Sequence, residues 1–135
     1  MASSASELAR LEIAGVRYNV YQASFESVKP VDQWNRVTAY ATKADARFVI
    51  EGSEETSKLF ALFANSRKAF DATLVLNKTN GEGELVRNEF KTCYVTYYAS
   101  RYDAVDSVPY TIEMVISARD TTIGEGVLQF DSKQV

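Results

Sequence analysis

Apolar and polar residues alternate along most of this chain, which is the pattern of half-buried β-strands. The alternation is cleanest over residues 110–119, where every second side chain from Tyr110 to Ala118 is apolar. The same reasoning, with breaks at glycine, proline and polar clusters, predicts seven strands. They cover residues 9–13, 16–28, 47–51, 72–78, 85–100, 110–119 and 127–130.

Two short connections between these strands have the composition of tight turns. Ala14-Gly15 separates the first two strands, and Asn80-Gly81 lies between the strands over 72–78 and 85–100. Asn-Gly is the strongest short-range signal of a β-hairpin, because both residues tolerate a positive φ. The pattern therefore predicts antiparallel pairing at both places.

The stretch over residues 16–28 changes its apolar face half-way along. The side chains that share a face are Val16, Tyr18 and Val20 in the first half, then Tyr21, Ala23 and Phe25 in the second. Because side chains alternate strictly along a regular strand, such a change predicts a β-bulge or a bend between two sheets. Barrels use this device at their corners.

One helix is predicted over residues 53–68. Ser53 can cap it, and Glu54-Glu55 place negative charge where the helix dipole favours it. The apolar stripe at helical spacing consists of Leu59, Phe60, Leu62 and Phe63. This stripe is interpreted as a packing surface, and Arg67-Lys68 suit the C-terminal end.

Residues 29–40 interrupt the alternation and predict a long loop or extended arm. Pro30 stops the preceding strand, and the small and polar residues 41–46 allow the arm to continue to Ala46. The arm holds Trp34, the only tryptophan, among polar residues. Its indole either packs back on its own domain or contacts a neighbouring molecule. The second alternative is considered because Trp is enriched at interface hot spots.

These elements predict a mainly β fold: an antiparallel β-barrel, or two packed sheets, with one α-helix and a long inter-strand arm. The 135 residues suit one domain, expected over residues 7–135 after a flexible leader at residues 1–6. That leader has no apolar stretch, so no cleaved signal peptide is expected. No apolar run approaches the length of a membrane span, and no membrane contact is expected.

Composition argues against most chemistry. The chain has no His, one Cys (Cys93) and no glycine-rich phosphate loop, so catalytic triads are excluded and neither a metal nor a cofactor is expected. Cys93 is interpreted as a buried thiol within a strand. Two carboxylates that meet only in the fold stay possible as an acid–base pair. Gly124-Glu125-Gly126 lacks the context of a dinucleotide-binding motif.

The net charge of −3 argues against nucleic-acid binding on electrostatic grounds, and none is expected. Tyr97, Tyr98, Arg101 and Tyr102 have the mixed aromatic and basic character of single-strand binding sites. Cross-strand aromatic packing at a strand end is the favoured interpretation of these four residues.

The order of the elements and several local strings resemble the haemolysin-coregulated protein family, the tube subunits of type VI secretion systems, and most of all its Bacteroidetes-type branch. The strings that carry this resemblance are residues 11–20 (LEIAGVRYNV), 24–25 (SF), 48–53 (FVIEGS), 59–60 (LF) and 110–119 (YTIEMVISAR). The resemblance covers about residues 7–124. Trp34-Asn35-Arg36-Val37 depart from it, because the arm of that branch often carries Gly and Pro there.

The resemblance implies a non-enzymatic subunit that closes into hexameric rings, which stack into the inner tube of a contractile injection apparatus. Its partners would be further copies of itself, with sheath, spike and baseplate proteins, and effectors carried in the lumen. It would be cytoplasmic before assembly and exported with the tube. The arm would then form the subunit interface through Val31, Gln33, Trp34, Asn35, Arg36, Val37 and Tyr40.

Three other functions stay open at this point. The chain could be the tail-tube protein of a related phage-like particle. A monomeric barrel could hold an apolar ligand among its Phe and Tyr side chains, which predicts a closed internal cavity. An enzyme that uses carboxylates predicts two acids in one cleft with a shifted pKa.

Overall fold

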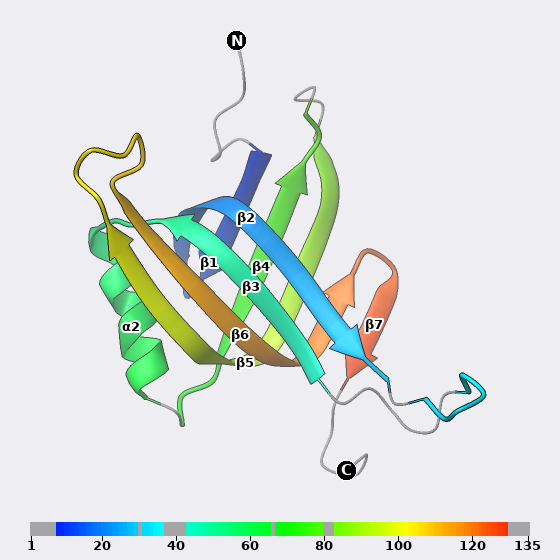
Figure 1. Ribbon diagram of the computed structural model, residues 1–135. Helices are drawn as coiled ribbons and strands as arrows, with labels where there is room; N and C mark the ends of the chain where they lie inside the picture. The colour runs from blue at the N-terminus through cyan, green and yellow to red at the C-terminus, as the bar shows by residue number, and fades with distance from the viewer. Residues whose placement is uncertain (1–7, 30, 37–42, 66, 80–82, 130–135) are drawn as a thin grey trace.

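The protein is an antiparallel β-barrel with one α-helix beside it (Figure 1). The computed structural model describes residues 8–29, 31–36, 43–65, 67–79 and 83–129. Within these ranges the strands are β1 (Ala9–Ile13), β2 (Val16–Val28), β3 (Lys43–Glu51), β4 (Phe70–Asn77), β5 (Glu84–Tyr102), β6 (Tyr110–Ile123) and β7 (Gly126–Gln129). A 3₁₀ turn, η1 (Glu54–Thr56), leads directly into α2 (Ser57–Ala64). The predicted fold class is confirmed.

The sheet closes on itself through strands that are distant in sequence. Its order is β3-β2-β1-β4-β5-β6-β7, and β3 also pairs with β6, which joins six strands into a closed ring. One edge of β6 is shared: residues 111–117 pair with β3, and residues 120–123 pair with β7. The other edge of β6 pairs with β5 over almost its whole length.

Two hairpins lie where the sequence predicts antiparallel pairing. Ala14 and Gly15 have φ angles of +53° and +81°, and they join β1 to β2 with Ile13 opposite Val16. Two consecutive positive φ angles are the mark of a type I′ turn, which matches the twist of the strands it connects. β4 and β5 also pair, although the Asn80-Gly81 turn lies outside the described residues.

The change of face along β2 is a bulge at Tyr21, as predicted. The pairing with β3 shifts there: Val20 lies opposite Ile50, and the next pair is Gln22 with Val49. The extra residue turns Phe25 toward the same side as Val20, and the Phe25 ring lies 6.1 Å from that of Phe90 in the core. The bulge therefore lets β2 place side chains in the core both before and after Tyr21.

The barrel interior is a packed core. Phe48, at its centre, is 0% exposed, and its ring meets that of Phe90 edge-on at 6.3 Å between centroids. The other buried members come from every strand for which burial is described, with Leu59 from α2. They include Leu11, Ile13, Val20, Ile50, Leu74, Ile112, Met114 and Ile116.

Two details of the sequence interpretation are wrong. β3 begins at Lys43, so the arm does not extend to Ala46, and Ala44 and Ala46 are buried inside the barrel. The helix ends at Ala64, which places Arg67-Lys68 beyond it. The predicted stripe does serve packing: Leu59 is fully buried and Leu62 packs against the core, while Phe60 and Phe63 stay 51% and 38% exposed.

No helix in the described residues is both long and apolar enough to cross a membrane.

Candidate subunit interface

The connection from β2 to β3 carries a turn that is closed by one carboxylate. Asp32 Oδ1 accepts hydrogen bonds from the backbone N–H groups of Trp34 and Arg36, both at 2.9 Å, and Oδ2 accepts one from Arg36 Nε at 2.8 Å. The Asp32 N–H also donates to the Arg36 carbonyl at 2.9 Å. These hydrogen bonds, led by that from the Arg36 backbone, lower the pKa of Asp32, so the carboxylate stays charged. The hydrogen bonds that hold this turn are thus all made between residues of the turn itself.

Trp34 stands at the tip of this turn and faces solvent. Its side chain is 66% exposed, and that of Val31 is 56% exposed. The Arg36 guanidinium lies 5.0 Å from the centre of the indole and covers one of its faces, a cation–π contact. Asn35 takes a φ of +63°, which asparagine tolerates better than most residues. Trp34 therefore does not pack back on its own barrel.

Most of the predicted interface residues lie together on this turn. Val31, Gln33, Trp34, Asn35 and Arg36 all fall between β2 and β3, and the side chains of all five are exposed. Val37 and Tyr40 lie outside the described residues. In Figure 1 the turn projects from the barrel at the end opposite to α2.

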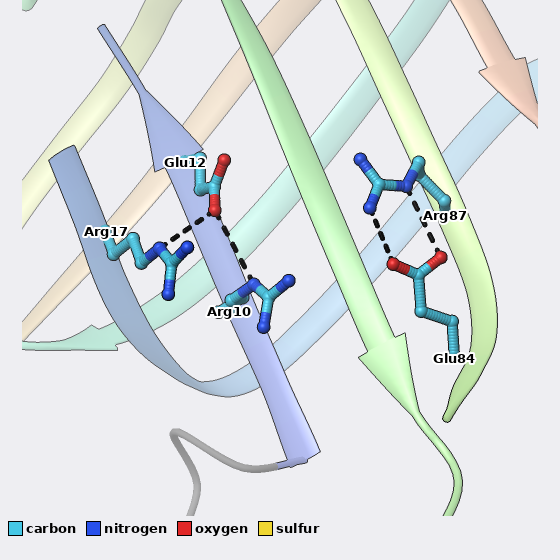
Figure 2. Close-up of polar contacts among 5 residues, drawn as sticks. All are labelled: Arg10, Glu12, Arg17, Glu84 and Arg87. Atoms are coloured by element: carbon cyan, nitrogen blue, oxygen red, sulfur yellow. Dashed lines mark hydrogen bonds and ion pairs between the residues drawn. The ribbon is translucent and has the colours of Figure 1, made fainter. Parts of the chain in front are cut away.

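A second surface, which the sequence analysis did not single out, is a set of ion pairs on the outer wall of the barrel (Figure 2). Glu12 receives two arginines, with Oε1 at 3.0 Å from Arg17 Nε and 3.6 Å from Arg10 Nε. Beside it Arg87 binds Glu84 at 2.6 Å, and this hydrogen bond lowers the pKa of Glu84. The alternation of positive and negative residues along β1 and β2 could have predicted these ion pairs from the sequence. This face is of mixed sign and largely self-neutralised.

A third surface is aromatic and joins α2 to β5. The ring of Phe60 meets that of Tyr98 edge-on at 5.2 Å between centroids, and the ring of Phe63 lies 6.2 Å from Tyr98. Further along, Tyr102 on β5 lies opposite Tyr110 on β6 with their rings 6.3 Å apart. The cross-strand aromatic packing that the sequence analysis favoured is confirmed for Tyr102, whereas Tyr98 packs against α2 and Tyr97 lies under the Arg47 guanidinium, 5.5 Å from the ring centre.

Cys93 is placed where its thiol is unreactive. It is 0% exposed, and burial, with a smaller effect of the nearby Asp71 carboxylate, raises its pKa to about 12. A thiolate is the reactive form of cysteine, so this residue suits packing better than catalysis. Among the described residues no group of three or more Cys, Asp or Glu side chains could hold a metal ion.

The buried thiol should make the fold sensitive to alkaline pH. The Cys93 thiol ionises near its ordinary pKa of 9.0 in the unfolded chain but near 12 in the folded one, so the folded state keeps the proton longer. The free energy of unfolding should therefore fall as the pH rises from 9 to 12. Tyr18, whose pKa burial raises from 10.0 to about 12, acts in the same direction.

Urea unfolding of the wild type and of Cys93→Ala at pH 8 and at pH 11 tests this expectation. The alanine variant should lose less stability between the two pH values than the wild type does. Any cavity cost is common to both pH values and cancels in the comparison. Equal losses in the two proteins would contradict the assignment.

The sequence model of one protein family, the haemolysin-coregulated protein Hcp (TssD), matches residues 5–131. The chain belongs to the Hcp family. No curated protein sequence matches this Hcp chain.

Solved structures of Hcp proteins share the fold of this Hcp chain. Hcp1 from Flavobacterium johnsoniae superposes with a TM-score of 0.82 at 24% identity, over 90% of this chain and 98% of that one. Hcp1 from Salmonella typhimurium gives a TM-score of 0.68 at 15% identity, over 90% of each chain. A chain from the sheath–tube complex of an extracellular contractile injection system gives 0.57 at 13% identity, over 87% and 88%.

Proposed function

We propose that this Hcp chain works as a hexameric ring whose copies stack into the inner tube of a type VI secretion apparatus. The chain is a tube subunit, and the observation that carries this statement is the family match over residues 5–131. Similar barrels occur in the sheath–tube complex and in a tube-terminating cap of other contractile systems. The size of the ring and the stacking of rings are our inference from the family.

Partners and location follow from the same role. Hcp proteins are secreted tube components that assemble with themselves inside a sheath. For this chain we further propose a cytoplasmic stage before assembly, export with the tube without a cleaved signal peptide, and contacts with spike, baseplate and effector proteins. A single domain over residues 7–135 fits this role.

We also propose that the chain has no enzymatic activity of its own. Hcp tube proteins are in general structural. The thiol of Cys93 is buried and its pKa is raised, so it is a poor nucleophile. The closed packing of Phe48 and its neighbours fills the barrel interior, which supports a structural subunit over a barrel that holds an apolar ligand.

The oligomeric state is the direct test of the ring. Size-exclusion chromatography with light scattering should give six times the mass of one chain, and negative-stain images should show rings. A protein that stays monomeric at the highest attainable concentration would contradict the proposal.

Replacing Trp34 by alanine should weaken ring assembly and leave folding almost unchanged. The side chain is 66% exposed in the isolated subunit, so its loss removes little intramolecular packing. As an interface hot spot it should raise the dissociation constant roughly 30-fold, the equivalent of about 2 kcal/mol. Light scattering over a dilution series measures assembly, and thermal unfolding measures the fold.

Tyr102→Ala is the matched control, because Tyr102 is an aromatic residue with 71% exposure on another part of the surface. It should change neither the dissociation constant nor the thermal midpoint by much. If Trp34→Ala lowers the thermal midpoint steeply and leaves the rings intact, Trp34 supports the fold and the arm is not the interface.

A further inference from the structure

An apolar groove lies outside the barrel, between the β1–β2 hairpin and α2. Its volume is about 370 Å³, near the lower end of the range for small-molecule sites. Side chains of the hairpin and of the helix line it, together with two residues that follow the helix. The lining residues are Ile13, Ala14, Val16, Tyr18, Lys58, Ala61, Leu62, Asn65 and Lys68.

Both walls of the groove are held in place by contacts within the subunit. The hydroxyl of Tyr18 donates a hydrogen bond to the Glu55 carbonyl at 3.2 Å, which joins β2 to the turn before α2. Leu59, on α2, is 0% exposed and holds the helix against the barrel core. Because the walls are fixed before a ligand arrives, filling the groove costs little conformational entropy.

The charged side chains that line the groove are all positive. They are Lys58 and Lys68, and no Asp or Glu is among the lining residues, although acids outnumber bases 18 to 15 in the whole chain. Lys58 pairs with the Glu55 carboxylate. Lys68 has no ion pair within the described part of the chain, so its ammonium group can bind a ligand.

The side-chain amide of Asn65 adds hydrogen-bond donors beside Lys68. Its Oδ1 accepts a hydrogen bond from the Arg67 backbone N–H at 3.3 Å, which occupies the oxygen end of the amide. Its two N–H donors have no acceptor among the residues that the structure describes. The groove therefore combines apolar walls with an ammonium group and an amide N–H₂, a set of donors that suits an anion.

We propose that this groove binds a small amphipathic anion, namely an organic acid with one carboxylate on an alkyl or aryl body. The apolar body lies between Val16 and Leu62, and the carboxylate accepts hydrogen bonds from Lys68 and Asn65. One negative charge is the best match, because Lys58 is already neutralised by its own pair. A cation would be repelled by the lysines, and a purely polar anion would gain nothing from the apolar walls.

This site is separate from the candidate interface around Trp34. Figure 1 shows α2 and the turn between β2 and β3 at opposite ends of the barrel. The groove also lies outside the packed core that surrounds Phe48. The inference therefore goes beyond the tube function and does not depend on how the copies assemble.

Isothermal titration calorimetry with decanoate, decanol and decylammonium tests the site on the purified wild-type protein. The three probes share one decyl chain and differ in the head group. Decanoate should bind once per subunit with a dissociation constant on the order of 100 µM, a normal affinity for a ligand of its size. Decanol should bind about 10-fold more weakly, and decylammonium should show no binding. No binding of decanoate, or equal binding of decanoate and decanol, would contradict the proposal.

A substitution at Lys68 tests the head-group contact. Lys68→Gln removes the charge and should raise the dissociation constant of decanoate about 5-fold, the effect of losing one partly exposed ion pair, while decanol binding stays the same. Lys91→Gln is the matched control, because Lys91 is an exposed lysine on β5 and does not line the groove. If both variants bind decanoate as the wild type does, the carboxylate does not lie at Lys68.

Filling the groove tests the place of the apolar body. Ala61→Trp puts an indole into the groove from α2 and should abolish the binding of decanoate and of decanol. Ala104→Trp, at an exposed position in the β5–β6 connection, should leave both unchanged. Amide chemical shifts of the wild type give a readout without any substitution: decanoate should shift residues 13–18 and 58–68.

The outcomes separate a site for free acids from other surfaces. Vesicles of phosphatidylglycerol should not bind the protein, and binding to vesicles without binding to decanoate would overturn the proposal. Shifts confined to other parts of the barrel would overturn it as well. Light scattering reports the assembly state separately, so a monomer that binds decanoate in the groove would contradict the ring and support the site.

Discussion

Phe48→Ala should destabilise the barrel by about 3–5 kcal/mol, the usual cost of removing a buried aromatic ring. Phe48 is 0% exposed and lies on β3, the strand that closes the sheet by pairing with both β2 and β6. Its ring packs edge-on against Phe90 from β5, so the alanine would leave a cavity between the closing strand and the opposite wall. This loss is a large part of the stability of an ordinary domain.

Urea unfolding monitored by circular dichroism measures the loss. Phe60→Ala is the matched control, because the same side chain is removed from α2 at a site that is 51% exposed. The control should cost clearly less, since its partners Phe63 and Tyr98 are themselves near the surface. Similar losses in both variants would mean that the barrel interior is not the main source of stability.

The strands could be predicted because each buries one face, and burial on one face imposes a period of two on the sequence. The bulge at Tyr21 was predictable for the same reason, since a change of phase in the alternation has few other causes. The start of β3 was not. Ala44 and Ala46 lie inside the barrel, but small side chains carry almost no hydrophobic signal. Their places follow from pairing, since both lie opposite β2 and Ala46 also lies opposite β6.

The helix shows the limit of periodic patterns. Leu59, Phe60 and Phe63 have helical spacing, yet only Leu59 reaches the core, because the helix is eight residues long and lies beside the barrel. The two phenylalanines pack against Tyr98 from a strand more than thirty positions away in the sequence. Contacts of this kind depend on the tertiary fold and leave no local signal.

The two candidate sites divide in the same way. Trp34 could be singled out from sequence, because a tryptophan in a polar connection has no place in an alternating pattern. The apolar groove beside the helix could not, because it combines the β1–β2 hairpin at residues 13–18 with α2 and the residues that follow it up to Lys68, and neither segment is unusual alone. An exposed tryptophan in a connection can be recognised from one segment, whereas a groove depends on how distant segments pack.

Gly52 should be the least replaceable glycine in the described part of the chain. It follows β3, where its N–H donates to the Tyr110 carbonyl at 2.8 Å, and the Tyr110 ring occupies the space that a Cβ atom would need. A Cβ atom on Gly52 would overlap the ring atoms Cγ and Cδ2 and come within 2.6 Å of Cε2. Since the overlap involves the base of the ring, rotation about χ2 alone cannot relieve it, and β6 or the turn must move.

Gly52→Ala is therefore expected to cost about 1–3 kcal/mol or more, the range of overpacking in a well-packed structure. Gly126→Ala is the control, because the nearest atom to its Cβ is a backbone oxygen at an ordinary 3.5 Å and its φ is not positive. Pairing the change with Tyr110→Ala should recover part of the loss, since the clash disappears with the ring. Denaturant unfolding of the wild type, Gly52→Ala, Tyr110→Ala and the double variant measures this coupling. Additive losses would show that the Tyr110 ring is not what makes glycine necessary at position 52.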